Sequence, residues 1–106
     1  MSFRYMRMLL FFDLPRTTSK EISDAARFVK RLKGEGFIML QESVYCKLLL
    51  NMSSFPAVKT RIEKIKPKVG NILLLTITEK QFSAIDVILG EMTHKEIDST
   101  NRVIIV

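Results

Sequence analysis

The feature that most constrains this chain is a short apolar run that ends in a single carboxylate. Residues 8–12 read Met-Leu-Leu-Phe-Phe and lead into Asp13, and Pro15 follows two residues later. Such a run is typical of a strand, and Pro15 ends it because proline fixes its own φ and disfavours the helical region for Leu14. Asp13 is therefore predicted at a strand end beside the core, where a carboxylate needs a cation, a hydrogen-bond donor or a proton.

The rest of the chain alternates between apolar strands and amphipathic helices. The run at 37–40 and the run at 43–50 are both β-prone, and they fit either a hairpin or one long bent strand. With these two runs, the predicted elements in order are a strand at 4–13, a helix at about 19–35, the two β-prone runs, a helix around 55–65, a strand at 71–78, a short helix at 79–89 and a final strand at 102–106.

This order predicts an α+β fold of the ferredoxin-like split βαββαβ type with an extra C-terminal strand, built as one domain over residues 1–106. Two helices cover only one face of a four-stranded sheet, yet residues 48–50 and 72–75 are apolar throughout. The uncovered face therefore predicts a homodimer that packs through sheet faces. The tail at 102–106 pairs with a sheet edge of its own chain or of the partner, or is a frayed terminus.

Charge points to an anionic partner. The net charge is +6 and the pI is about 9.7, which favours nucleic acid first and a membrane surface second. No apolar run approaches the roughly 20 residues of a membrane span, so we expect no membrane association. The single cysteine, Cys46, excludes an internal disulfide and predicts a cytoplasmic location.

The basic residues fall into clusters suited to binding backbone phosphates without base-specific contacts. Arg4, Arg7 and Arg16 bracket the first strand, while the predicted helices carry most of the other positive charges. The alternative is an ordinary solvated surface, neutralised in part by Asp24 and Glu35. The predicted nucleic-acid-binding residues are Arg16, Lys20, Arg27, Lys30, Arg31, Lys59, Arg61, Lys64, Lys66 and Lys68.

The residue type and position of Asp13 allow two interpretations of its role. If two copies meet through their sheets, two Asp13 carboxylates lie near the two-fold axis, and magnesium suits a site with one or two carboxylates and several waters. Alternatively, Asp13 caps the turn at Thr17 and Thr18. No second acid accompanies Asp13 within its own motif, so a two-metal site inside one chain is not expected.

Three segments resemble the CRISPR-associated Cas-two family. They are residues 4–15 (RYMRMLLFFDLP), residues 36–45 (GFIMLQESVY) and residues 70–82 (GNILLLTITEKQF), and the last is similar to the version found in type II systems. The resemblance implies a ferredoxin-like homodimer, the small subunit of the complex that captures foreign DNA and inserts it into the CRISPR array. It also implies that Asp13 is the magnesium position. Many members carry a tyrosine just before this aspartate, whereas this chain has Phe12.

Two main functions follow from the resemblance and the residues together. The first is an antiviral-defence subunit for spacer acquisition, a basic homodimer that bridges the larger CRISPR integrase and binds duplex DNA. The second is a magnesium-dependent endonuclease that cuts RNA or DNA with Asp13 as metal ligand and catalytic residue. A third hypothesis is a ferredoxin-like nuclease or regulatory dimer unconnected with CRISPR. The scarcity of acids around Asp13 favours the first function.

Overall fold

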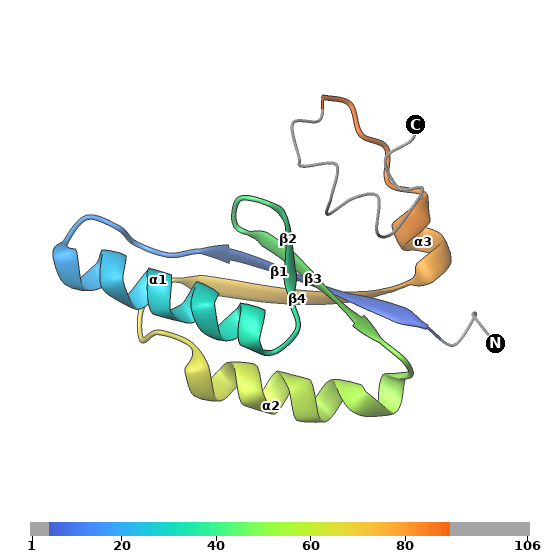
Figure 1. Ribbon diagram of the computed structural model, residues 1–106, viewed down its shortest axis with the longest axis horizontal. Helices are drawn as coiled ribbons and strands as arrows, with labels where there is room; N and C mark the ends of the chain where they lie inside the picture. Colours follow the sequence, from blue (N-terminus) through green and yellow to red (C-terminus); the bar gives the residue numbers. More distant parts are fainter. Residues whose placement is uncertain (1–4, 90–106) are drawn as a thin grey trace.

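A computed structural model describes residues 5–89 of the chain, in which the predicted βαββαβ order is confirmed (Figure 1). The predicted strand at 102–106 and the predicted start of the first strand at Arg4 lie outside the described residues. The elements are β1 (Met6–Asp13), α1 (Ser19–Gly34), β2 (Ile38–Gln41), β3 (Val44–Leu49), the short 3-10 helix η2 (Met52–Ser54), α2 (Phe55–Ile65), β4 (Asn71–Thr78) and α3 (Glu79–Ser83).

The strands of residues 5–89 form one antiparallel sheet in the order β2-β3-β1-β4. The first strand, β1, is central, because it pairs with β3 along one edge and with β4 along the other. The ladder between β1 and β4 runs without interruption from Met6 opposite Thr78 to Asp13 opposite Asn71. Both long helices lie on one side of this sheet (Figure 1). The arrangement is the ferredoxin-like α+β fold that the sequence predicts.

The two β-prone runs, which fitted either a hairpin or one bent strand, form a hairpin. β2 and β3 pair in antiparallel fashion, with Gln41 opposite Val44 and a register shift between Met39 and Gln41. The turn between them places Ser43 in the left-handed region, with φ of 69°. Such a backbone is tolerated in tight turns, where polar residues are common.

Helix α1 starts and ends at positions with clear local causes. The hydroxyl of Thr18 accepts a hydrogen bond from the backbone N–H of Glu21, and the Glu21 carboxylate accepts one from the backbone N–H of Thr18. This capping box satisfies N–H groups that have no partner within the helix. At the other end the helix stops at Gly34, one residue before the predicted end, and the Lys47 ammonium donates to the Glu35 carbonyl at 2.7 Å.

The main core lies between the sheet and the two long helices. Met8, Leu10 and Phe12 of β1 reach this side, where they belong to one buried cluster with Phe28 of α1 and Ile62 of α2. The rings of Phe12 and Phe28 meet edge to face, with centroids 5.7 Å apart. The even-numbered residues of β1 therefore face the helices. No helix within residues 5–89 combines the length and the apolar character needed to cross a membrane.

Within residues 5–89, the opposite face of the sheet is covered only at the end where β1 begins, where α3 lies (Figure 1). There Phe82 of α3 packs against Leu9 and Cys46 in a second, smaller core. Further along the sheet, Leu73 and Leu75 of β4 remain 66% and 51% exposed. We call this uncovered part, which includes Leu73 and Leu75, the open face.

Helix α3 is shorter than the sequence predicts. The sequence predicts a helix that spans 79–89, but α3 ends at Ser83, whose hydroxyl lies within hydrogen-bonding distance of the backbone carbonyls of Glu79 and Lys80. Its one fully buried side chain is Phe82, while Ile88 and Leu89 are almost completely exposed. Without a core face to pack against within the described residues, these last apolar positions do not extend the helix, since short helices depend on tertiary packing.

A largely buried ion pair holds α3 on the sheet. Arg7 of β1 is only 9% exposed, and its guanidinium donates to both carboxylate oxygens of Glu79, at 2.8 and 3.1 Å. The same guanidinium lies 4.4 Å from the centre of the Phe82 ring. Burial opposes the charge on Arg7, but the Glu79 carboxylate holds the pKa of Arg7 above its ordinary value. Arg7 is therefore a structural residue and does not belong to an exposed basic patch.

Cys46 lies beneath the same helix and has no exposed surface. Its sulfur is 3.9 Å from a guanidinium nitrogen of Arg7. Burial raises the pKa of the Cys46 thiol, although the nearby charge of Arg7 acts in the other direction. A buried, protonated thiol is a poor nucleophile, so Cys46 serves the packing of the fold.

We predict that α3 loosens when Glu79 loses its charge. Glu79→Gln should lower the free energy of unfolding, measured in urea, by about 1–2 kcal/mol, because Arg7 stays largely buried without an ionised partner. The cost stays moderate because the Glu79 side chain is 34% exposed. Lys80→Gln on the same helix is the control and should change stability by less than about 0.5 kcal/mol. Equal stability of Glu79→Gln and wild type would contradict this account.

Candidate nucleic-acid interface and acidic site

Asp13 is the last residue of β1, and it is exposed. The alternation of side chains along a strand places it on the same side as Leu9 and Phe11, away from the two long helices. Within residues 5–89 its carboxylate forms no hydrogen bond or ion pair. Asp13 thus stands at the strand end, as predicted, at the opposite end of the sheet from α3.

The alternative in which Asp13 caps the turn at Thr17 and Thr18 is wrong. The backbone N–H groups of both threonines donate instead to the carboxylate of Glu21, at 2.9 and 3.1 Å. Glu21 already satisfies the donors that Asp13 was expected to reach. The local fold therefore gives no structural use for the Asp13 carboxylate.

The donors available for a metal ion near Asp13 are few. Nowhere in the described part of the chain do three His, Cys, Asp or Glu side chains come together as a metal-binding group. Magnesium is commonly held by one or two protein carboxylates and keeps several waters. One chain supplies a single carboxylate at Asp13, and a second copy placed against the same face would supply another. The donor chemistry therefore fits magnesium best in a two-chain arrangement.

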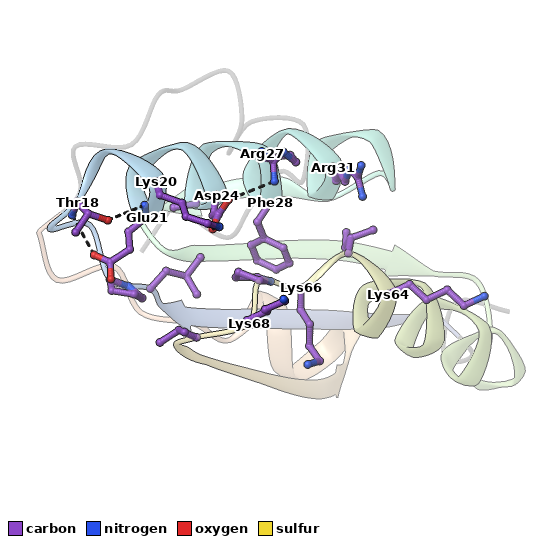
Figure 2. A pocket seen from close by; sticks show the side chains of 16 residues that line it. Thr18, Lys20, Glu21, Asp24, Arg27, Phe28, Arg31, Lys64, Lys66 and Lys68 are labelled. Carbon is purple, nitrogen blue, oxygen red and sulfur yellow. Dashed lines mark hydrogen bonds and ion pairs between the residues drawn. The ribbon is translucent and has the colours of Figure 1, made fainter.

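Six of the ten predicted nucleic-acid-binding residues, from α1, the end of α2 and the residues after it, line one groove, which we call the basic groove. It has a volume of about 550 Å³ and lies between α1 and the segment formed by the end of α2 and the residues after it (Figure 2). The acids Glu21 and Asp24 also line it, so six positive and two negative side chains give a formal charge of +4. The six cations are Lys20, Arg27, Arg31, Lys64, Lys66 and Lys68.

The sequence explains why these side chains share one groove. Along α1, Lys20, Arg27 and Arg31 are spaced by seven and four residues, and such positions lie on one side of a helix. On the other side of the groove, Pro67 disfavours the helical region for Lys66, whose φ of −66° and ψ of 149° are extended. The chain after α2 therefore runs as an extended segment that lines the groove from the side opposite α1 (Figure 2).

Within the groove, Asp24 pairs with two of the cations. Its carboxylate lies 3.0 Å from the Lys20 ammonium and 3.3 Å from the Arg27 guanidinium. The hydrogen bond from Lys20, supported by the charges of Lys20 and Arg27, lowers the pKa of Asp24. In the described part of the chain, the other four cations of the groove form no ion pair. The groove thus holds both neutralised and unneutralised positive charge.

Four of the predicted basic residues lie outside the groove. Lys30 is exposed on α1 and forms no ion pair with the residues that the structure describes. The other three are held by carboxylates: Arg16 by Glu42 at 4.0 Å, Lys59 by Glu63 at 3.0 Å and Arg61 by Glu35 at 2.7 Å. The pair of Arg61 with Glu35 connects α2 to the end of α1, so Arg61 helps to hold the helices together.

The groove and the acidic site lie on different sides of the sheet. Leu14 lines the groove from the helix side, whereas the preceding residue, Asp13, faces the other way. The structure therefore does not bring Asp13 together with the six cations of the groove. Sequence reasoning described the two helical clusters separately and missed that they meet, because their meeting depends on how α1 and α2 pack on the sheet.

Comparison with known proteins gives a consistent result. A family model described as CRISPR associated protein Cas2 matches residues 6–85. A protein of Streptococcus mutans serotype c, named CRISPR-associated endoribonuclease Cas2, is 46% identical over 99 residues, which are 93% of this chain and 91% of that protein. Proteins with the same name from Treponema denticola and Ligilactobacillus salivarius are each 39% identical over 100 residues, covering 94% of this chain and 99% of theirs.

Proposed function

Because the chain belongs to the family of CRISPR associated protein Cas2, we propose that it is an adaptation subunit of a CRISPR system. In this role a basic homodimer binds duplex DNA and bridges subunits of the larger integrase during spacer capture and integration. The reaction takes place in the cytoplasm, and the chemistry of strand transfer lies in the integrase. The observation that carries the proposal is the basic groove, with six cations against two acids.

The groove suits the backbone of a duplex better than it suits individual bases. Its charged side chains are long lysines and arginines on the protein surface, which neutralise phosphates and release counterions from DNA. Contacts of this kind position a duplex but do not distinguish one base sequence from another. A homodimer presents the groove twice, and two chains of charge +6 give a formal total of about +12.

The open face supports the homodimer. Two helices cover the other side of the sheet, and α3 covers one end of this side, which leaves Leu73 and Leu75 in contact with solvent. A second copy placed with its own open face against this one removes the apolar surface of both from water. In that arrangement the basic grooves stay accessible, because they lie on the helix side of each sheet.

A second candidate function is a magnesium-dependent endoribonuclease. It is favoured by the names of the relatives and by the exposed Asp13 carboxylate, which has no partner within residues 5–89. In this alternative, Asp13 of each copy would hold magnesium, which supplies an activated water for phosphodiester cleavage when bound. The single carboxylate that each chain supplies at Asp13 favours the scaffold role over the nuclease role, since no group of three metal-ligating side chains forms within residues 5–89.

The open face is tested by one charge placed on it, at Leu75. We expect Leu75→Glu to weaken dimerisation by about a hundredfold or more, because the new carboxylate would be buried without a partner at the interface. Sedimentation equilibrium measures the dissociation constant. Ile22→Glu is the matched control, since Ile22 is 52% exposed and Leu75 is 51% exposed, but Ile22 lies on α1 on the helix side. A dimer that tolerates Leu75→Glu as well as Ile22→Glu would refute packing through this face.

The basic groove is tested by removing single cations. We expect Arg31→Gln and Lys66→Gln each to weaken duplex binding about three- to tenfold and to reduce the salt slope by about one, because each removes one phosphate contact. Fluorescence anisotropy across a salt series measures both quantities. Lys33→Gln removes the same charge from an exposed position of α1 outside the groove, and it should have less than about a twofold effect. Equal losses for Lys33→Gln and Lys66→Gln would show that only the net charge matters.

The choice between scaffold and nuclease depends on Asp13. We expect Asp13→Asn to support integration of a short duplex by the integrase within about twofold of wild type, because a scaffold does not need this carboxylate. Both proteins must first be shown to dimerise. Loss of integration while the complex still assembles would contradict the scaffold role. Magnesium-dependent RNA cleavage by the wild type, abolished in Asp13→Asn, would establish the second function.

A further inference from the structure

Asp24 occupies an unusual place among the cations of the basic groove. It lies in the interior of α1, beyond the first helical turn, so it neither caps the helix nor interacts strongly with the helix dipole. Its carboxylate accepts from Lys20 at 3.0 Å and from Arg27 at 3.3 Å, one oxygen for each cation. Figure 2 shows these three side chains together on the helix that borders the groove. Asp24 therefore occupies the position, relative to Lys20 and Arg27, that a phosphate oxygen would take.

From this arrangement, and resting on the proposed function of the groove, we propose that Asp24 is an internal competitor of nucleic-acid phosphates. Without nucleic acid it holds Lys20 and Arg27. When a duplex enters, its phosphates take these two cations away from Asp24. Until that exchange occurs, the groove offers Arg31, Lys64, Lys66 and Lys68 to its ligand.

The exposure of the three side chains makes this exchange feasible. The side chains of Lys20 and Arg27 are 82% and 59% exposed, and that of Asp24 is 28% exposed. Ion pairs at such exposed positions are weak and are screened by salt. Charge-assisted hydrogen bonds from these cations to a phosphate are at least as strong as those to the Asp24 carboxylate, and arginine can make two of them at once. A polyanion that also contacts the other four cations can therefore displace Asp24, whereas a single phosphate cannot gain those additional contacts.

The inference predicts a gain of binding when Asp24 loses its charge. Asp24→Asn should bind a short DNA duplex about three- to tenfold more tightly at roughly 0.1 M salt, because Lys20 and Arg27 become available. The slope of log K against log salt should steepen by about one to two, since each added phosphate contact contributes about 0.9. The wild-type homodimer and the variant are compared by fluorescence anisotropy over a salt series, after urea unfolding shows that both are folded.

A matched control separates this effect from a simple change of net charge. Glu63→Gln also removes one carboxylate from a helical pair four residues apart, that of Lys59 with Glu63 on α2, but neither residue lines the groove. It should leave the affinity within about twofold and the salt slope unchanged. In a chain that also carries Lys20→Gln and Arg27→Gln, Asp24→Asn should lose most of its gain, because the cations through which it acts are gone.

The outcomes distinguish a failure of this inference from a failure of the proposed function. If Lys66→Gln weakens binding but Asp24→Asn behaves like wild type or like Glu63→Gln, the groove binds DNA and the competitor role of Asp24 is wrong. If Asp24→Asn weakens binding, Asp24 instead holds the two cations in their binding positions, and the inference is also overturned. If neither Lys66→Gln nor Asp24→Asn changes binding, the groove is not the DNA site and both proposals fail.

Discussion

The structure depends on the central strand β1, which is buried on both of its faces for most of its length. Met8 and Leu10 face the long helices, while Leu9 and Arg7 face the other side under α3. A strand of this kind must have a neighbour at each edge and a cover on each face, because its backbone needs partners and its side chains need a dry surface. Residues 5–89 provide the two neighbours and one complete cover. Within these residues the second cover stops at α3, and under the proposed function a second copy covers the open face.

The end of β1 separates two chemical surfaces by a single peptide unit. Asp13 turns to the side of the open face, whereas Leu14 turns to the basic groove. Under the proposed function, a partner copy and a duplex bind on opposite sides of the sheet. For the nuclease alternative, the same geometry means that a phosphate held in the groove does not lie beside Asp13 of the same chain.

Local patterns in the sequence predicted most of the fold, and long-range contacts account for what they missed. The strand at 71–78 and the start of α1 at Ser19 are encoded by residues within one segment, so they were predicted correctly. Helix α3 was predicted too long, because periodicity cannot show whether Ile88 has a core to pack against. Arg7 was grouped with surface cations, because its partner Glu79 is 72 residues away. The meeting of two basic clusters in one groove was missed for the same reason, because it depends on residues that are far apart in the sequence.

The distribution of acids decides which cations remain available for a ligand. On α2, Glu63 forms an ion pair with Lys59 outside the groove. Glu35, at the end of α1, forms an ion pair with Arg61 of α2 and so connects the two helices. Both pairs lie outside the groove, and they stabilise α2 and the contact between the two helices. Under the proposed function Asp24 differs from these acids, because its carboxylate lies in the groove and competes with a phosphate for Lys20 and Arg27. Its pairs with Lys20 and Arg27 also stabilise α1, as helical pairs three and four residues apart do. Under the proposal, the same carboxylate makes the groove respond more to a long polyanion, which also contacts the other four cations, than to small anions.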